Sequence, residues 1–263
     1  MPHADNEGVR IFYDVAGDGP AMVLIHANPF DHNLWLYQTA RFSTRFRVVA
    51  PDLRGYGHSA KVATPFGLDD LAKDIIAVCA HAGVTRAIVG GISVGSGIAL
   101  ALALDYLKLV QALVLVGGAS SRPASYDRHI AGYEQDFPAY RRTQMEECFA
   151  PGFAATPRGR YLIETFLEFN PRLDGKAIAQ VFRARGNTDL RPRLPSLQLP
   201  VLVVNGAHDM SLKPGRETAS LIPGAEQVTL NNTGHCCNIE DPAAFDQAVV
   251  DFLRRNGLWP EAA

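Results

Sequence analysis

The sequence predicts an α/β fold that consists of a largely parallel sheet, helices on its faces and a helical insertion. Three observations lead to this prediction. Short, uninterrupted apolar runs recur along the chain, which is the pattern of strands buried on both faces of a parallel sheet. Segments with apolar residues at helical spacing lie between these runs. From about residue 119 to residue 194 the apolar runs stop, and helical segments follow one another.

Seven segments have the composition of strands. The first, residues 9–15, alternates between apolar and polar side chains, as a half-exposed strand does. The second, residues 22–25, is the first of the continuous apolar runs. The others lie at residues 46–50, 87–90, 112–116, 201–204 and 227–230.

Three helices of the body of the protein are marked by their patterns. Residues 68–79 carry one apolar stripe at helical spacing. Residues 97–104 have no polar face, so this helix is expected to be buried against the sheet. The last helix is expected to begin with Asp241 as N-cap and Pro242 in the first helical position, and Gly257 fits its carboxyl cap.

The helical insertion divides the chain into two parts. Residues 1–118 and 195–263 are expected to form one α/β core, and residues 119–194 to emerge from the carboxyl edge of its sheet. Prolines punctuate the insertion and separate its segments. Its helices are expected near residues 126–136, 140–149, 158–169 and 176–185.

The bulk composition excludes several classes of partner. The 263 residues have a formal net charge of −2, which gives no sign of a nucleic acid or an anionic membrane as partner. No uninterrupted apolar stretch reaches the length of about 18 residues that a membrane-spanning helix needs. Residues 1–7 lack the basic start and apolar centre of a signal peptide. We therefore expect a cytoplasmic protein that binds neither membranes nor nucleic acid.

The cysteines are not expected to form disulfides or to bind a metal. Without an export signal, Cys79, Cys148, Cys236 and Cys237 are expected to be reduced thiols that serve as small packing residues. Adjacent Cys236 and Cys237 are a poor disulfide pair and lack a partner at metal-site spacing. We expect no metal and no cofactor.

The most informative motif is Gly91-Ile92-Ser93-Val94-Gly95, between a predicted strand and a predicted helix. In a turn this tight the serine backbone is strained, and side chains two residues away on either side would collide, which explains Gly91 and Gly95. The Ser93 hydroxyl is then exposed at the carboxyl edge of the sheet, above the free N–H groups of a helix start. The motif resembles the nucleophile elbow of the α/β-hydrolase family.

Two further residues follow strands in the order that a catalytic triad of this family requires. Asp209 lies on the loop after residues 201–204, and His235 lies on the loop after residues 227–230. Taken singly, Asp209 is equally well explained as a loop residue that makes a turn, and a lone histidine at the position of His235 would more often be structural. Because the carboxyl ends of parallel strands meet at one edge of a sheet, we expect both side chains to converge with Ser93. Ser93, Asp209 and His235 are therefore predicted to be nucleophile, acid and base.

The resemblance to the α/β-hydrolase family covers nearly the whole chain outside the insertion. It implies a mostly parallel eight-stranded sheet with residues 119–194 as a helical cap. The segment His26-Ala27-Asn28-Pro29 resembles the family's His-Gly-x-Pro loop, with alanine at the usual glycine position. By this match the oxyanion donors are the backbone N–H groups of Asn28 and Val94, and His26 is expected to brace the loop.

Two other segments resemble family signatures and are interpreted as scaffold. Residues 51–59 suit a tight loop near the site, in which Asp52 and Arg54 are expected to pair. Glu240 and Asp241 follow His235 and are expected to be charges at a helix start.

The resemblance implies a hydrolase that acts on a small, largely apolar ester or lactone. A serine nucleophile attacks a carbonyl, whereas relatives that open epoxides or cleave carbon–halogen bonds need an aspartate at this position. Length and layout resemble enol-lactonases and small carboxylesterases. Hydrolysis of a carbon–carbon bond, perhydrolase activity on the same triad, and a non-catalytic protein that binds a small ligand stay open as alternatives.

The substrate pocket is expected to lie between the insertion and the core. Five aromatic residues are candidates for an apolar lining, namely Phe30, Phe149, Phe153, Phe166 and Phe182. An equally good interpretation is that the phenylalanines of the insertion dock its helices on the core. Four cationic residues either bind a substrate carboxylate or are solvated, namely Arg141, Arg142, Arg183 and Arg185.

Overall fold

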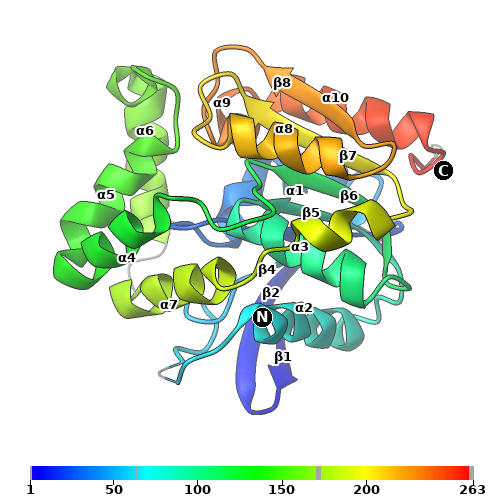
Figure 1. Cartoon of the computed structure of the whole chain (residues 1–263), viewed down its shortest axis with the longest axis horizontal. Helices are drawn as coiled ribbons and strands as arrows, with labels where there is room; N and C mark the ends of the chain where they lie inside the picture. The colour runs from blue at the N-terminus through cyan, green and yellow to red at the C-terminus, as the bar shows by residue number, and fades with distance from the viewer. Residues whose placement is uncertain (1, 63, 170–172, 261–263) are drawn as a thin grey trace.

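The computed structural model describes residues 2–62, 64–169 and 173–260. Its centre is an eight-stranded sheet in the order β1-β2-β4-β3-β5-β6-β7-β8 (Figure 1). The strands are β1 His3–Asn6, β2 Val9–Ala16, β3 Ala21–Ile25, β4 Arg47–Pro51, β5 Ala87–Ile92, β6 Val110–Val116, β7 Val201–Gly206 and β8 Glu226–Leu230. Strands β1, β2 and β4 pair antiparallel, and all other pairs are parallel. The predicted α/β fold with a mostly parallel eight-stranded sheet is confirmed.

Strand β1 is the one strand that the apolar pattern did not predict. Its sequence is polar (His3-Ala4-Asp5-Asn6), and Ala4 is the one member that is buried. The strand pairs with β2 through a tight turn in which Glu7 and Gly8 both have positive φ angles, 51° and 87°. Two positive φ angles are typical of the two-residue turns that join antiparallel strands.

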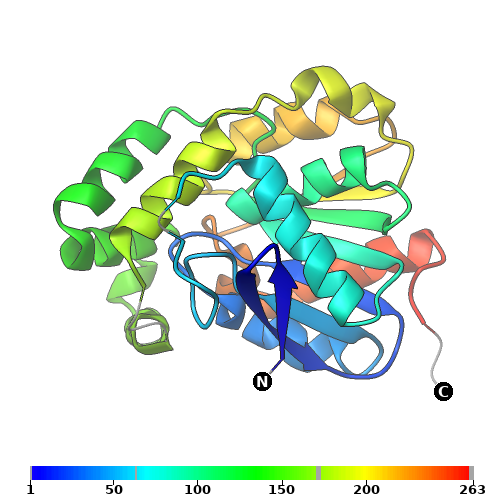
Figure 2. The ribbon, with the colours of Figure 1, turned by 90° about the horizontal axis from the view of Figure 1, so that it is seen from below.

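The two faces of the sheet pack against different helices, because successive side chains of a strand point to opposite faces. Val23, Val89 and Val203 belong to the core on one face, and Met22, Ile88 and Leu202 to the core on the other. The first face is covered by α2 Leu68–His81, α3 Val94–Asp105 and α8 Leu212–Leu221. The second face is covered by α1 Leu36–Phe42 and α10 Pro242–Arg255, as Figure 2 shows from below.

The last helix, α10, has the predicted ends. The Asp241 side chain accepts a hydrogen bond of 3.0 Å from the Ala244 N–H, and Pro242 occupies the first turn. Beyond Arg255, Gly257 adopts a φ of 66°. Within the described residues, no helix combines the length and apolar character required to cross a membrane.

Helical segments occupy the chain between β6 and β7, where the sequence predicts the insertion. They are α4 Tyr126–Gln135, α5 Phe137–Glu147, η2 Phe153–Ala155, α6 Pro157–Phe169, α7 Gly175–Gly186 and η3 Arg191–Ser196. Helices α4, α5 and α6 stand beside the sheet, at the left of Figure 1, and α7 returns toward α3. Pro138 does not separate two helices but lies in the first turn of α5, where its missing N–H has no partner to lose.

The order of the strands places a crevice beside β3 and β5. These strands are neighbours in the sheet, but β4, which follows β3 in the chain, lies on the other side of β3. The loops that leave β3 and β5 therefore diverge. Ligand sites of open α/β sheets form at such points, beyond the carboxyl ends of the strands. Asn28 follows β3 and Ser93 follows β5 at this edge.

Candidate active site

Ser93 sits in the strained turn that the glycine pattern predicts. Its backbone has φ 82° and ψ −103°, a conformation that residues other than glycine rarely adopt. A Cβ atom at Gly91 would lie 2.3 Å from the carbonyl oxygen of Gly95, and a Cβ at Gly95 would lie 2.4 Å from that of Ile25. Both positions therefore exclude any side chain, and the turn holds Ser93 at the end of β5.

The turn is fixed by hydrogen bonds to the neighbouring strand. The Ser93 N–H donates to the Val116 carbonyl oxygen at 2.9 Å. The Ser96 hydroxyl donates to the Gly91 carbonyl oxygen at 2.6 Å and accepts from the Val116 N–H at 3.1 Å. Val94 is the first residue of α3, so its N–H belongs to the helix end that has no partner within the helix.

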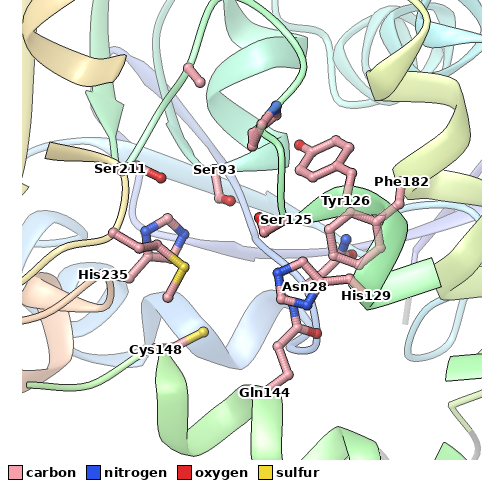
Figure 3. Close-up of a pocket in the computed structure, with 14 residues that line it drawn as sticks. Asn28, Ser93, Ser125, Tyr126, His129, Gln144, Cys148, Phe182, Ser211 and His235 are labelled. Atoms are coloured by element: carbon pink, nitrogen blue, oxygen red, sulfur yellow. The ribbon is translucent and has the colours of Figure 1, made fainter. Parts of the chain in front are cut away.

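His235 and Asp209 meet as the order of the strands predicts. The His235 Nδ1 lies 2.8 Å from the Asp209 Oδ1, and both side chains are buried. The same aspartate accepts from the Ser211 N–H at 2.7 Å and from the Asn205 Nδ2 at 2.8 Å. With Nδ1 engaged by the carboxylate, the Nε2 of His235 is the nitrogen left to face the pocket. Figure 3 shows the imidazole beside the Ser93 side chain.

Each member of this pair favours the charged form of the other, so the pKa of His235 is raised and the pKa of Asp209 is lowered. Burial alone would lower the pKa of His235, but the charge of Asp209 and its hydrogen bond raise that pKa to about 9. Burial alone would raise the pKa of Asp209, but His235 and the hydrogen bonds from Ser211 and Asn205 hold it below its ordinary value. Asp209 is therefore ionised and favours the protonated form of His235.

Gly117, which the sequence analysis did not single out, makes room for the imidazole. It follows β6 with a φ of 56°. A Cβ atom at this position would lie 2.5 Å from Cε1 and 2.6 Å from Nδ1 of His235, and 3.3 Å from Oδ2 of Asp209. The sequence does contain a signal that could have identified it, namely a glycine directly after a predicted strand, at the same edge of the sheet as Ser93.

We expect Gly117→Ala to lower the kcat/KM of the reaction at this site about 100-fold, because a displacement of about 1 Å in a reacting group has an effect of that order. The added methyl group would push the His235 ring away from Ser93. Gly83→Ala is the matched control, since Gly83 also has a positive φ (68°) but nothing within 4 Å of its Cβ position. Both variants should lose about 1 kcal/mol of unfolding free energy. Equal activity of the two variants would contradict this role of Gly117.

The loop of His235 is held by Glu240, which the sequence analysis interpreted as a charge at a helix start. The structure corrects this interpretation. Glu240 ends the short helix α9 Cys237–Glu240, and its carboxylate accepts from the Gly234 N–H at 2.6 Å and from the Ala150 N–H at 2.8 Å. It thereby ties the histidine loop to the segment after α5.

The four cysteines are free thiols in the interior, as expected. Cys148 does more than pack, because it lines the pocket together with His235. Its carbonyl oxygen accepts from the Cys236 N–H at 2.8 Å, which adds a second link between the histidine loop and the segment after α5.

The loop after β3 is braced by His26, as predicted. His26 is fully buried, its Nδ1 lies 3.0 Å from the Ala27 carbonyl oxygen, and its Nε2 accepts from the Leu53 N–H at 3.0 Å. Burial lowers the pKa of His26, so the ring is neutral and its two nitrogens serve one as donor and one as acceptor. Ala27 does not have a positive φ, so this loop does not need glycine there. Asn28 lies at the pocket.

Asp52 and Arg54 do not pair, contrary to expectation. The Asp52 carboxylate accepts from the His32 Nδ1 at 2.7 Å, whereas the Arg54 guanidinium binds Asp74 at 2.6 and 2.7 Å. Donor atoms of Asp31, His32 and Asp52 lie within 4.8 Å of one another, a spacing that a metal ion could bridge. However, the Asp52 oxygens already accept hydrogen bonds from His32 and from the His58 N–H, so the residues present do not fit an open metal site.

Ser93 and His235 face a pocket whose lining is more polar than predicted (Figure 3). Its lining residues are Asn28, Ser93, Gly117, Ala119, Pro123, Ser125, Tyr126, His129, Gln144, Cys148, Phe182, Met210, Ser211 and His235. Of the five predicted phenylalanines, Phe182 is in this lining. The pocket therefore offers a substrate several hydrogen-bonding groups besides those of the predicted triad.

The other four phenylalanines do not line this pocket, which corrects the prediction. Phe30 packs edge to face against Phe166, with ring centroids 5.2 Å apart, and Phe149 stacks on Phe153 at 4.9 Å. All four belong to, or pack against, the core cluster that joins the inserted helices to one face of the sheet. The alternative interpretation, that phenylalanines dock these helices, holds for them.

The four arginines of the insertion also lie outside the lining of this pocket. Arg185 donates to the carbonyl oxygens of Ala119 and Thr188, the latter at 3.1 Å, and Arg141 donates to those of Phe166 and Leu167. The other two form surface ion pairs, Arg142 with Glu164 and Arg183 with Glu134.

Known proteins agree with the fold. A family model described as alpha/beta hydrolase fold matches residues 20–158. The 3-oxoadipate enol-lactonase 2 of Acinetobacter baylyi is 26% identical over an alignment of 264 residues, with 95% of this chain and 95% of that protein covered. The chain belongs to the α/β-hydrolase family, and the hydrolase class that its sequence predicts is confirmed.

Solved structures give the same result. The enol-lactonase of Burkholderia xenovorans has a TM-score of 0.90 and 27% identity, with 96% of this chain and 100% of that chain covered. Est816, described as an N-acyl homoserine lactone degrading enzyme, has a TM-score of 0.83 and 28% identity, with 95% and 100% covered.

Proposed function

We propose that this protein is a serine hydrolase that cleaves a carboxylic ester or lactone of a small molecule through an acyl-enzyme. The observation that carries the proposal is the 2.8 Å contact between His235 Nδ1 and Asp209 Oδ1, beside a strained Ser93 that faces the same pocket. The similarity to three proteins that are named for lactones supports a substrate of this class. We also propose that residues 119–194 act as a cap over the site, since α4 and α5 supply part of its lining.

The mechanism follows from the arrangement of the three side chains. Neutral His235 removes the proton of the Ser93 hydroxyl through Nε2, and the hydroxyl oxygen attacks the substrate carbonyl. Asp209 holds the imidazole by Nδ1 and stabilises the positive charge that the ring acquires. The ring then gives its proton to the leaving alcohol oxygen, and the acyl group stays on Ser93. In the second half a water molecule, deprotonated by His235, releases the acid.

Negative charge develops on the carbonyl oxygen in both halves of the reaction. We propose that the backbone N–H groups of Asn28 and Val94 stabilise this charge. Val94 is favoured because it starts α3, where unpaired N–H groups and the helix dipole both attract an anion. Asn28 lies on the neighbouring loop after β3, at the same pocket.

Labelling with a fluorophosphonate probe tests this proposal. We expect one probe molecule per folded chain, attached to the peptide that contains Ser93, and no labelling after heat denaturation. The probe reacts only with a serine that a neighbouring base makes nucleophilic, so the result separates a hydrolase from a protein that only binds a ligand. Absence of labelling on folded protein would refute the proposed mechanism. Mass spectrometry of the digested protein locates the label.

A further inference from the structure

Two amide side chains in the pocket wall have the same unusual arrangement. Asn28 comes from the loop after β3 and Gln144 from α5, and each is 5% exposed. The oxygen of each amide accepts a hydrogen bond from a buried tyrosine hydroxyl, Tyr56 for Asn28 and Tyr133 for Gln144. Neither amide nitrogen is engaged by that contact, and the Nδ2 of Asn28 is buried without a hydrogen-bond partner.

The tyrosines fix which end of each amide faces the pocket. Tyr56 and Tyr133 are 0% and 2% exposed, and burial raises the pKa of both hydroxyls well above its ordinary value. Each hydroxyl therefore keeps its proton and must donate it, because a buried unpaired donor costs about 1 to 3 kcal/mol. Only the amide oxygen is able to accept, so the NH₂ group of each amide points away from its tyrosine.

The rest of the lining carries no full charge on this wall. Among the described residues, no lysine, arginine, aspartate or glutamate lines the pocket. His129 is held through Nδ1 by the Tyr140 hydroxyl at 3.0 Å, and burial together with Arg128 lowers its pKa to about 4, so its ring is neutral. Figure 3 labels Asn28, His129 and Gln144 in the same part of the pocket. The wall thus offers neutral donors. In the reactive form, in which His235 is neutral, the charge of the ionised Asp209 behind it disfavours a second anion nearby.

We propose that Asn28 Nδ2 and Gln144 Nε2 form a subsite for an uncharged carbonyl oxygen of the substrate, separate from the carbonyl that Ser93 attacks. A carbonyl oxygen has two lone pairs and accepts from two donors at once. The substrate is then an ester or lactone with a ketone or amide group elsewhere in the molecule, rather than a purely apolar ester or one with a free carboxylate. This inference rests on the proposed function, which it deepens.

A matched set of methyl esters tests the subsite. Methyl 4-oxopentanoate and methyl 5-oxohexanoate carry the second carbonyl, methyl pentanoate and methyl hexanoate lack it, and monomethyl succinate carries a carboxylate instead. Each kcat/KM is divided by the rate constant for alkaline hydrolysis of the same ester, which corrects for intrinsic reactivity. We expect at least one oxo ester to have a corrected kcat/KM about tenfold higher than the plain ester of the same chain length, because each neutral hydrogen bond contributes about 3- to 10-fold. We expect the carboxylate ester to be poorer than the oxo esters.

Two variants of Gln144 assign the preference to this wall. Gln144→Met removes the donor at similar length. Gln144→Glu still accepts from Tyr133 and so retains that buried contact, but it presents a carboxylate oxygen to the substrate. In Gln144→Met, which leaves the Asn28 donor in place, we expect the kcat/KM ratio of oxo to plain ester to fall about threefold or more. In Gln144→Glu, whose carboxylate oxygen repels the substrate carbonyl oxygen, we expect the ratio to fall to about one. Simple loss of stability changes neither ratio. An unchanged ratio in both variants would overturn the proposal.

Binding to Ser93→Ala separates this proposal from the proposed function. Calorimetry with the preferred oxo ester and its plain partner should give dissociation constants that differ about tenfold, and Gln144→Glu in the same background should abolish the difference. If wild-type protein hydrolyses no ester, the proposed function fails while the binding ratio still decides the subsite. If the binding ratio is near one, the subsite is refuted whatever the turnover. If Asn28→Leu lowers kcat/KM equally for oxo and plain esters, the Asn28 side chain acts at the carbonyl that Ser93 attacks, and its part in the subsite is refuted.

Discussion

Replacement of Ser93 by alanine is expected to lower ester or lactone turnover at least 10⁴-fold, with the fold unchanged. Without the hydroxyl no acyl-enzyme forms, and the residual rate comes from the oxyanion donors and substrate binding alone, which is typical of serine hydrolases that lack the nucleophile. Alanine has the same backbone preferences as serine at φ 82°, so the turn should persist. Steady-state kinetics on esters and lactones, with circular dichroism as a check of folding, measure both effects.

Ser93→Gly is the matched control for this experiment. It also removes the hydroxyl, but glycine adopts a positive φ without strain. We therefore expect it to be as inactive as the alanine variant and to have an unfolding free energy about 1 kcal/mol higher. Activity near that of the wild type in either variant would exclude Ser93 as nucleophile. Equal stability of the two variants would show that the turn is not strained.

The sheet was predictable because a strand buried on both faces needs an uninterrupted apolar run. Residues 22–25, 87–90 and 201–204 have such runs, and all three are central parallel strands. Strand β1 has no such run, because it lies at the edge of the sheet and buries one side chain, Ala4. Its pairing depends on the turn at Glu7 and Gly8 and on contact with β2, neither of which an apolar pattern records.

The positions of Ser93, Asp209 and His235 were predictable for a topological reason. Each follows a parallel strand, and the carboxyl ends of parallel strands share an edge, so chain order alone brings these residues near one another. Their assignment as a triad stays a prediction until it is tested. Gly117 was not predictable in the same way. Its importance depends on how the His235 ring lies over its backbone, which is decided by packing across β6 and β7.

The residues that line the pocket were not predictable, because a single sequence does not show which partner each side chain contacts. An apolar pattern indicates that Phe166 is buried but not whether it contacts a ligand or Phe30. A charge pattern likewise shows that Arg54 needs a carboxylate, but the carboxylate proved to be Asp74 on α2 rather than nearby Asp52. Gln144 carried no signal, because its role depends on the Tyr133 hydroxyl that orients its amide.

Replacement of Asp209 by asparagine is expected to lower kcat/KM about 10⁴-fold and to change its dependence on pH. An asparagine does not hold the imidazole in the required tautomer or stabilise its charge, and such a change in other serine triads has an effect of this size. The reacting base is neutral His235, whose pKa is raised to about 9. In the wild type kcat/KM should therefore rise about tenfold per pH unit below pH 8 and level off near pH 9, as the imidazole loses its proton.

The variant should lose this rise. Without the charge of Asp209 the dominant remaining influence on His235 is burial, which lowers its pKa, so the imidazole is already neutral at pH 7. Its small residual kcat/KM should be nearly constant between pH 7 and 9, measured on an ester whose background hydrolysis is subtracted at each pH. Glu240 is not able to replace the lost carboxylate, because both of its oxygens accept hydrogen bonds from backbone N–H groups. A profile that still rises to pH 9 in Asp209→Asn would mean that another group titrates, and the pairing of Asp209 with the base would no longer explain the activity.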